Sequence, residues 1–440
     1  MSRAGVAALA VALMAGAGSS GHASVSETKT RPERTGPVSR AGGMVADAGS
    51  FGHVSVSETK TRPERTTLLG LLSRGTTSEL VRVEPRSLRL LGPRVPVGLH
   101  DFPWSRSPDG TRVVLGSGRA RSVRFVDVRP LRGGRRLAVD GFVAALAWVA
   151  PRRALVIAAG RCCPQPLRAL VVDPERGILR RRLVARGGVI DAARSERGIV
   201  LLLGGQGRIR PARLAVVGPE GGVRSVELPG VRAGSRQLRP RLSEYRTPGL
   251  AVDRTRGRAF VVGASPAVVA EVHLGTLRVT YHRPVERRLA DGGNAIGVAR
   301  RALWLDGALA VTGHDDHIEG RSQVTEPAGL NLVDTRDWSS RELASDVHSA
   351  ARAGGLVVGW GLQRAALVAY ARDGRERLRI VRTPAGGGLQ LAWPYAYRGA
   401  DDAYRPHRAD VIDLRTGRIA RARVPGWLAL LGDDERLCWC

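Results

Sequence analysis

The hydrophobic positions of this chain gather in short, strand-length runs of Val, Leu, Ile and Ala from residue 67 to the C-terminus, separated by Gly, Pro, Asp and Arg. No long apolar pattern with a 3.6-residue period stands out, so the pattern predicts strands rather than helices. With 440 residues, of which 43% are hydrophobic, the chain can bury one large closed domain or two ordinary ones. We therefore expect an all-β fold.

One unit recurs along the chain: an apolar strand that ends in an acidic or polar residue, a turn, and a second strand. The clearest copies are Val126-Asp127-Val128, Val171-Val172-Asp173, Leu332-Val333-Asp334 and Val411-Ile412-Asp413, and weaker ones centre on Glu84, Gly218, His273 and Ala371. Successive centres are 43, 46, 45, 55, 61, 37 and 42 residues apart. Most spacings suit the ~40–50 residues of a four-stranded propeller blade, and the two long ones predict inserted loops.

A second hairpin precedes most of these units, and its best copy is Ser107-Pro108-Asp109-Gly110 followed by an apolar strand. Trp104 and Trp148 stand at the same place in two consecutive units. This pattern resembles the bacterial WD-repeat-like and YVTN-type β-propellers over about residues 67–440, although the Trp-Asp and Gly-His signatures of true WD repeats do not recur. The resemblance implies a single propeller and is nearly silent on function.

The repeat predicts seven or eight four-stranded blades, since eight centres are visible and the family habit favours seven. We expect the terminal strand Trp427–Leu431 to pair with the unit near Leu68–Leu80 and close the ring, which removes open sheet edges. The alternative is a pair of β-sandwiches or another β-rich two-domain protein.

The N-terminus has the three parts of a secretory signal peptide, which we place at residues 1–23: a positive start, an apolar stretch from Ala4 to Ala17, and small residues after it. Residues 24–66 are polar and predict a disordered linker with a duplicated segment, because 18 of the 21 residues in 15–35 recur at 46–66. No later apolar run is long enough to span a membrane. We expect a secreted, extracytoplasmic protein and a monomer.

The formal net charge is +29, and nearly all of the positive charge is Arg, since the only lysines are Lys29 and Lys60. The arginines are spread along the whole chain and interleaved with Asp and Glu. A nucleic-acid-binding protein usually gathers its charge on one face or helix, so we expect no specific nucleic-acid partner.

Two polar clusters are the candidates for chemistry. Imidazole and carboxylate ligands together suit a transition metal, and the metal candidates, expected in the longest inserted loop, are His314, Asp315, Asp316 and His317. Aromatic and charged residues together on a loop often mark a binding surface, and the ligand-binding candidates are Tyr395, Tyr397, Asp401, Asp402, Tyr404 and His407. In both cases the alternative is an ordinary loop, either solvated or packed locally. No cofactor is assured by the sequence, and a divalent metal is the one candidate.

The four cysteines come in two close pairs and are disulfide candidates: Cys162, Cys163, Cys438 and Cys440. A bridge between the pairs would tie the third unit to the C-terminus and close a very long loop. Units three blades apart are not neighbours in a propeller, which argues against that bridge, and vicinal pairing or a copper or zinc site are the alternatives.

The chain has no Gly-x-Ser-x-Gly nucleophile elbow, no phosphate loop and no His-Glu-x-x-His motif. We therefore expect a secreted binding or scaffold protein that uses the loop faces of a propeller to bind a protein or glycan partner in the cell envelope. The alternative is a propeller enzyme of the lactonase or lyase type with a metal in the channel. A relative of the quinoproteins is a third reading, which the low aromatic content weakens.

Overall fold

The computed structural model describes most of the segment that was predicted to form the propeller. It covers residues 67–440 except 76, 99–102, 118–119, 161–165, 241, 264–266, 285–294, 321, 362–366, 382–388, 401–407, 433–434, 436 and 439–440. The predicted signal peptide, residues 1–23, and the predicted linker, residues 24–66, lie outside the described residues. Among the described residues there is no helix that is long and apolar enough to cross a membrane.

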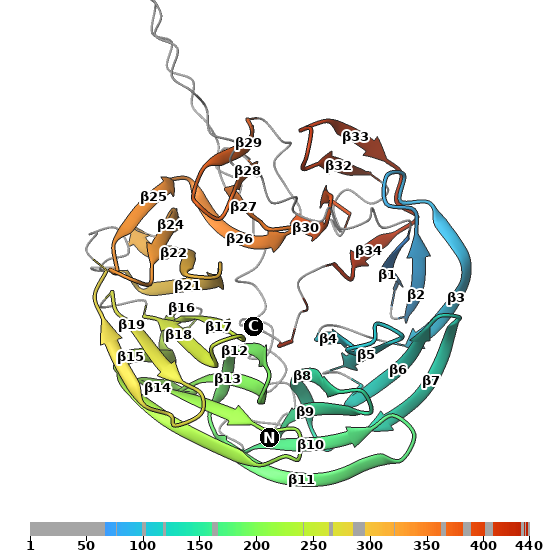
Figure 1. The fold of residues 1–440 in the computed structure, drawn as a ribbon, viewed down its shortest axis with the longest axis horizontal. Coiled ribbons are helices and arrows are strands. Elements are labelled where there is room, and N and C mark those ends of the chain that lie inside the picture. The colour runs from blue at the N-terminus through green and yellow to red at the C-terminus, as the bar shows by residue number, and fades with distance from the viewer. Residues whose placement is uncertain are drawn as a thin grey trace, which may run out of the picture. The chain divides into compact units, whose positions relative to one another are not determined.

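The described elements are all strands, and they follow one recurring order from the centre of the domain outwards (Figure 1). The innermost strands are β34 (Trp427–Leu430), β4 (Trp104–Arg106), β8 (Phe142–Ala150), β12 (Gly188–Ser195), β17 (Gly249–Asp253), β21 (Gly297–Trp304), β26 (Val347–Ala353) and β30 (Leu389–Ala392). The second strands are β1 (Leu68–Arg74), β5 (Arg112–Ser117), β9 (Arg153–Ala159), β13 (Gly198–Gly204), β18 (Arg258–Val262), β22 (Ala308–Glu319), β27 (Leu356–Gly361) and β31 (Tyr395–Arg398).

The third strands are β2 (Thr77–Val83), β6 (Ser122–Val128), β10 (Pro166–Asp173), β14 (Arg208–Val217), β19 (Val269–His273), β24 (Leu330–Asp334), β28 (Leu367–Tyr370) and β32 (Ala409–Asp413). The outer strands are β3 (Leu90–Gly98), β7 (Leu131–Ala138), β11 (Gly177–Arg186), β15 (Val223–Arg239), β20 (Val279–His282), β25 (Ser340–Ala344), β29 (Glu376–Ile380) and β33 (Ile419–Ala422). Two further strands, β16 (Leu242–Thr247) and β23 (Ser322–Pro327), belong to inserted hairpins.

The strands form six separate four-stranded blades and one ten-stranded sheet. The prediction of an all-β propeller with four-stranded blades is confirmed, but the count of separate blades is lower than the seven or eight expected. The reason lies in the ten-stranded sheet, where β12–β15 and the group β21, β22, β24 and β25 are joined edge to edge through β16. The parallel pairing of β16 with β21 fuses what the repeat spacing counts as separate units.

The ring closes as the sequence predicts. β34, the last strand of the chain, pairs antiparallel with β1, with Leu71 opposite Ala429 and Leu72 opposite Leu428. A hydrophobic cluster that includes Tyr397, Leu68 and Leu428 then packs the last complete blade against this one. The first and last parts of the domain are therefore held together by both backbone pairing and side-chain burial.

The core lies between the sheets. The second and third strands are covered on both faces by neighbouring sheets, so they read as continuous apolar runs, as in Ile199-Val200-Leu201-Leu202-Leu203, which is buried throughout. Trp148 is wholly buried and packs edge-on against Phe125 of the preceding blade, with ring centroids 5.5 Å apart. The outer strands carry polar residues because one side of each faces solvent.

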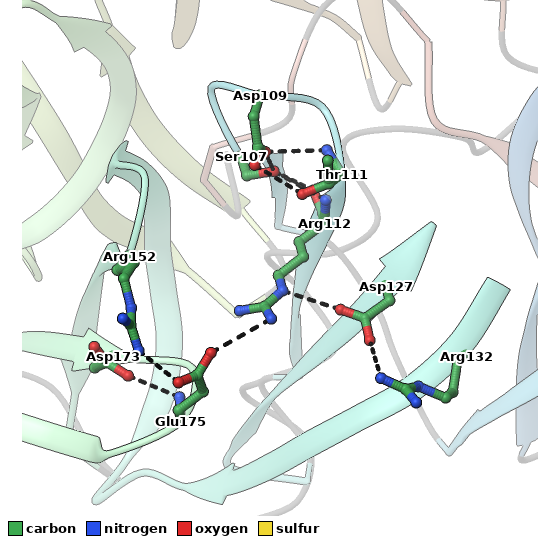
Figure 2. A network of polar contacts seen from close by, with 9 residues as sticks. All are labelled: Ser107, Asp109, Thr111, Arg112, Asp127, Arg132, Arg152, Asp173 and Glu175. Carbon is green, nitrogen blue, oxygen red and sulfur yellow. Dashed lines mark hydrogen bonds and ion pairs between the residues drawn. The ribbon is translucent and has the colours of Figure 1, made fainter. Parts of the chain in front are cut away.

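Each predicted repeat centre lies within one residue of the end of a third strand, where a turn leads to the outer strand. The acidic centres hold these turns: Asp173 Oδ1 accepts a hydrogen bond from Glu175 N at 2.8 Å (Figure 2). The same oxygen accepts from Arg176 N at 2.9 Å. In the hairpin between β4 and β5, hydrogen bonds from Ser107 and Thr111 lower the pKa of Asp109 to about 2. Gly110 provides the left-handed backbone, at φ 67°, that this turn needs.

Arginines on four outer strands connect their own group of strands to the next one. On four outer strands, a guanidinium donates to a backbone carbonyl in the third turn of the following group: Arg135 to Glu175 O, Arg180 to Glu220 O, Arg224 to Gly275 O and Leu274 O, and Arg341 to Asp373 O. Carboxylates add cross-links, as where Arg112 lies between Asp127 and Glu175 (Figure 2). We call the four side chains that donate to carbonyls, Arg135, Arg180, Arg224 and Arg341, the outer arginine clamps. They account structurally for part of the arginine excess.

The two long repeat spacings contain inserted hairpins. In the first, the end of β15 pairs with β16, and in the second the end of β22 pairs with β23. The two hairpins are joined where Tyr245 of β16 lies opposite Gly297 of β21. The insertions therefore form one continuous platform of strands, rather than the loops that the spacing predicted.

Candidate functional site

Four innermost strands end with an arginine on the same side of the domain. Arg106 ends β4, Arg194 is next to last in β12, Arg254 follows β17 directly, and Arg352 is next to last in β26. Because the innermost strands have the same direction in every repeat, these ends meet at one mouth of the centre. Arg254 Nε donates to Arg194 O at 3.1 Å, and the charges of Arg194, Arg352 and Glu435 all act on the Arg254 guanidinium. We call these four residues the inner arginine cluster.

The C-terminal segment runs from β34 into this cluster. Arg106 Nη2 donates to Leu431 O at 2.6 Å, and farther along, Leu146 N of β8 donates to Leu437 O at 2.7 Å. Cys438 forms an isolated bridge with Ala145 of β8. Leu437 and Cys438 are both buried in the hydrophobic cluster between β8–β11 and β12–β14. The described residues of the segment thus contact β4 at Leu431 and the third blade at Leu437 and Cys438.

Glu435 places its carboxylate at the cluster. Its Oε1 accepts hydrogen bonds from Arg106 N at 2.7 Å, Arg194 Nη2 at 2.9 Å and Ser105 Oγ at 3.3 Å, and its Oε2 lies 2.7 Å from Arg194 Nη2. The side chains of Arg194 and Glu435 are only 17% and 16% exposed. Charge-assisted hydrogen bonds in such a partly dehydrated place are stronger than those at the surface. Among the described contacts of the cluster, Arg194 is the guanidinium that binds this carboxylate.

A second carboxylate, Asp191, lies along the same strand as Arg194 and near Cys438. Its Oδ1 accepts from Ala192 N at 2.8 Å and lies 4.0 Å from Cys438 Sγ, and its Oδ2 accepts from Leu250 N at 3.3 Å. Burial raises the pKa of Asp191 to about 6, and the charge of Arg301 opposes that shift only in part. Asp191 therefore changes its protonation state in a range where ordinary aspartates are ionised.

Desolvation is the main cause that lowers the pKa of Arg254, and the charges of Arg194 and Arg352 act in the same direction, whereas Glu435 raises it. An added negative group near Arg254 would relieve this repulsion between guanidinium groups. The charged groups that act on Arg254 are thus two guanidinium groups and one carboxylate.

The sequence contains a signal for this cluster in the residues before its turns. In each of the four repeats the arginine stands just before the first hairpin turn: Arg106-Ser107-Pro108-Asp109-Gly110, Arg194-Ser195-Glu196-Arg197-Gly198, Arg254-Thr255-Arg256-Gly257 and Arg352-Ala353-Gly354-Gly355. Aligning the turns, rather than counting arginines along the chain, places the four side chains at equivalent positions. The even spread of arginine in sequence hides a concentration in space.

The four predicted metal ligands lie in strand β22 of the platform, and the expectation that they occupy a loop is wrong. Because side chains alternate along a strand, they separate into two pairs. His314 and Asp316 share Tyr245, whose hydroxyl lies 3.1 Å from His314 Nε2 and donates to Asp316 Oδ2 at 2.6 Å. Asp315 instead pairs with Arg300 at 2.6 Å, and His317 lies 3.7 Å from Glu326.

No three His, Cys, Asp or Glu side chains within the described ranges are placed to hold a metal ion. Asp316 is buried and also accepts from Gln323 and Thr325, both at 2.7 Å, so its lone pairs are used to join β22 to β23. Burial is the main cause that lowers the pKa of His314. The network ties the two hairpins of the platform together.

The two tyrosines at the start of the second predicted cluster lie in strand β31, not in a loop, and they are core residues. Tyr395 is 3% exposed and Tyr397 is not exposed, and both pack in the cluster next to β1 and β2. Arg86 Nε donates to the Tyr395 hydroxyl at 2.6 Å across that junction. Two large residues, Tyr395 and Tyr397, alternate with the small residue Ala396, and an apolar strand, β32, follows in the sequence. This pattern is typical of a strand. The other candidates, Asp401, Asp402, Tyr404 and His407, lie outside the described residues.

Cys438 is disulfide-bonded. The remaining cysteines, Cys162, Cys163 and Cys440, lie outside the described residues. Cys438 pairs with Ala145 of β8, so the C-terminal cysteine lies beside the third unit although β34, the strand before it, belongs to another blade. The bonding partner of Cys438 stays a prediction.

Comparisons with known proteins identify a fold and no family. No family model matches the chain, and no curated protein matches it. Among solved structures, it is similar to the dihydro-heme d1 dehydrogenase NirN in complex with DHE, with 12% identity and a TM-score of 0.57 over 84% of this chain and 76% of that one. It also aligns with Citrobacter koseri AztD, at 12% identity and a TM-score of 0.49 over 84% and 99% of the two chains. At such identities the likeness concerns the β-propeller fold alone.

Proposed function

We propose that the protein is an exported binding protein of the scaffold type, which holds an anionic group of its ligand or partner at the inner arginine cluster. The observation that carries the proposal is the seat of Glu435, where a guanidinium, a backbone N–H and a hydroxyl all donate to one carboxylate. Three donors that converge on one anion form a recognition site, and the mouth of a propeller is where ligands of this architecture dock. Arginine is suited to it because its planar donors match carboxylate and phosphate groups.

The test is calorimetric titration of the full chain with citrate and with inorganic phosphate at low ionic strength. We expect saturable binding that weakens as salt is added. Arg254→Gln removes one charge of the cluster without breaking the Arg194–Glu435 pair, and we expect it to weaken binding roughly tenfold, as the loss of a charge-assisted contact would. Arg254→Lys should restore part of the affinity.

Arg377→Gln is the matched control, because Arg377 is exposed on the outer strand β29 of another part of the domain. It removes the same formal charge far from the mouth, so binding should be unchanged. Equal losses in the two variants would reduce the effect to net charge and refute the site, as would the absence of saturable binding to the unmodified chain.

Export is part of the proposal. A disulfide at Cys438 supports it, because disulfides persist in oxidising compartments and are rare in the cytosol. The signal-peptide pattern of residues 1–23 points the same way. Expression with a secretory host, followed by mass spectrometry of the mature N-terminus, tests this: cleavage after Ala17 or Ala23 is expected, and retention of Met1 in an exported or cytosolic product would contradict it.

The finer assignment to the WD-repeat-like or YVTN type is likewise a proposal, supported by the strand and turn pattern around Asp109 and Asp173. If the fused sheet is counted as two groups joined by β16, the ring would have eight units, which agrees with the eight repeat centres. The lactonase-like alternative needs a metal in the centre, and the described residues bring no three ligands together for it.

A further inference from the structure

We infer that the C-terminal segment is an intramolecular ligand, and that the place which it occupies between the edge of β8 and the inner arginine cluster is a binding site for an acidic peptide with a glutamate two positions before an apolar residue. This inference rests on the proposed function in using the same inner arginine cluster, and it extends that function from an anion to an extended peptide. The segment shows how such a peptide is held, through its backbone, its carboxylate and its apolar side chain.

The backbone of the segment is recognised by β8. β8 is the innermost strand of a four-stranded blade and pairs with β9 on one edge only, so its other edge faces the centre of the domain. There, Leu146 N donates to Leu437 O at 2.7 Å and Ala145 pairs with Cys438. Addition of an extended chain to a strand edge is a general mode of peptide recognition, in which the main chain supplies affinity.

The side chains of the segment supply specificity. Glu435 reaches the inner arginine cluster and receives three hydrogen bonds there, while Leu437 enters the cluster of buried residues that contains Leu155 and Leu201. The segment thus places a charged residue in one site and an apolar residue in another, two positions apart in the sequence. Together the two sites would select the pattern Glu-x-Leu.

Charge complementarity agrees with this assignment. The sequence before Arg436 is Gly432-Asp433-Asp434-Glu435, the only run of three consecutive acidic residues in a chain of net charge +29. In sequence the run follows β34, and its last residue, Glu435, lies at the inner arginine cluster. An acidic peptide from a partner would meet the same donors once the segment is displaced.

The segment is also secured covalently, because Cys438 is disulfide-bonded. Reduction of that bond removes one restraint on the segment and leaves the hydrogen bonds of Glu435 and Leu437. We therefore expect exchange between the segment and a peptide to be faster under reducing conditions.

The experiment uses the full chain with a protease recognition sequence in place of residues 432–434, cleaved after folding and then reduced. The probe is a fluorescein-labelled peptide with the sequence of residues 432–438 in which Cys438 is replaced by serine, added in excess and followed by fluorescence polarisation. We expect binding to the cleaved chain and none to the uncleaved chain. Replacing Glu435 of the peptide by Gln should weaken binding by roughly ten- to a hundredfold, because a charge-assisted contact is lost.

Two outcomes would overturn the inference: equal binding of the Glu and Gln peptides, or no uptake of labelled peptide by a cleaved, folded chain whose own segment has been shown by mass spectrometry to be released. If the cleaved segment stays bound, hydrogen exchange on the intact chain decides. Glu435→Gln should then speed exchange of the Leu146 amide at least tenfold, and unchanged exchange would refute the role of Glu435.

The outcome is separable from that of the proposed function. Citrate binding to the intact chain without peptide binding to the cleaved chain would leave an anion site and remove the peptide site. Peptide binding without citrate binding would keep the peptide site and remove the small-anion site.

Discussion

The arginines of this protein form two populations that differ in what they hold. Each outer arginine clamp donates to backbone carbonyls of the next sheet, as where Arg224 binds Gly275 O at 2.6 Å and Leu274 O at 2.8 Å. In the inner arginine cluster, the guanidinium groups of Arg106, Arg254 and Arg352 also donate to backbone carbonyls. Arg194 differs, because it pairs with the side chain of Glu435, which arrives from the C-terminal segment. Carbonyl acceptors are part of the scaffold and cannot leave, whereas a carboxylate on a terminal segment can be replaced. The comparison teaches that the same residue type is structural at the rim and available for recognition at the centre.

The largest effect is expected where the inner population meets its carboxylate. Arg194→Ala would leave Glu435 in a site that is only 16% exposed, without its ion-pair partner. Removing one partner of a buried pair costs about 3–5 kcal/mol, since the remaining charge stays dehydrated. Urea denaturation of Arg194→Ala should show a loss near the lower end of this range, because Arg106 N and Ser105 Oγ still donate to Glu435.

The double variant Arg194→Ala/Glu435→Ala is the control for this first prediction. If the two residues act as a pair, the double variant should be more stable than the sum of the single losses allows. Strict additivity would mean that the contact has no energetic weight, and the contrast between centre and rim would lose its main support.

A smaller effect at the centre depends on pH. The pKa of Asp191 is about 6 in the folded protein, against about 3.9 for an unperturbed aspartate, so between pH 4 and pH 6 the folded state holds a proton that the unfolded state has lost. Stability therefore falls as pH rises through this window, by at most about 3 kcal/mol. Asp191→Asn should flatten that part of the curve of unfolding free energy against pH. An equal slope in the variant would assign the dependence to other groups.

The features of the fold that the sequence predicts are those set by interactions between residues close together in the chain or repeated in each unit. The strand order, the turns at Asp173 and Asp413 and the pairing of β34 with β1 were predictable, because turn chemistry and apolar runs are local and repeat. The fusion of two groups through β16 was not, because parallel pairing of Tyr245 with Gly297 joins segments 52 residues apart without a sequence signature.

The site was harder to predict than the fold for the same reason. The closeness of His314 and His317 in the sequence predicted a shared metal site. Both lie in β22, where side chains alternate, so they point to opposite faces of the strand and contact different partners. Arg194, Arg254 and Glu435 are far apart in sequence and meet only because the repeat brings equivalent strand ends to one mouth. Proximity in a repeat protein is set by position within the unit, so a search for candidate sites must compare units and not neighbours along the chain.

The smallest effect is expected at the rim. Arg224→Gln removes two hydrogen bonds from a guanidinium to carbonyls, but these carbonyls lie at turns where water can take its place. Net contributions of about 0.5–1.5 kcal/mol per hydrogen bond are typical, and exposure places this case near the low end, so we expect a loss of about 1 kcal/mol in urea denaturation. Arg152→Gln is the reference, because its ion pair with Glu175 is well exposed on both sides and should contribute less than about 0.5 kcal/mol (Figure 2). The loss in the free energy of unfolding should therefore decrease in the order Arg194, Arg224, Arg152. A loss at Arg224 as large as that at Arg194 would show that backbone carbonyls at the rim bind arginine as strongly as the carboxylate at the centre does. The distinction between the two populations would then fail.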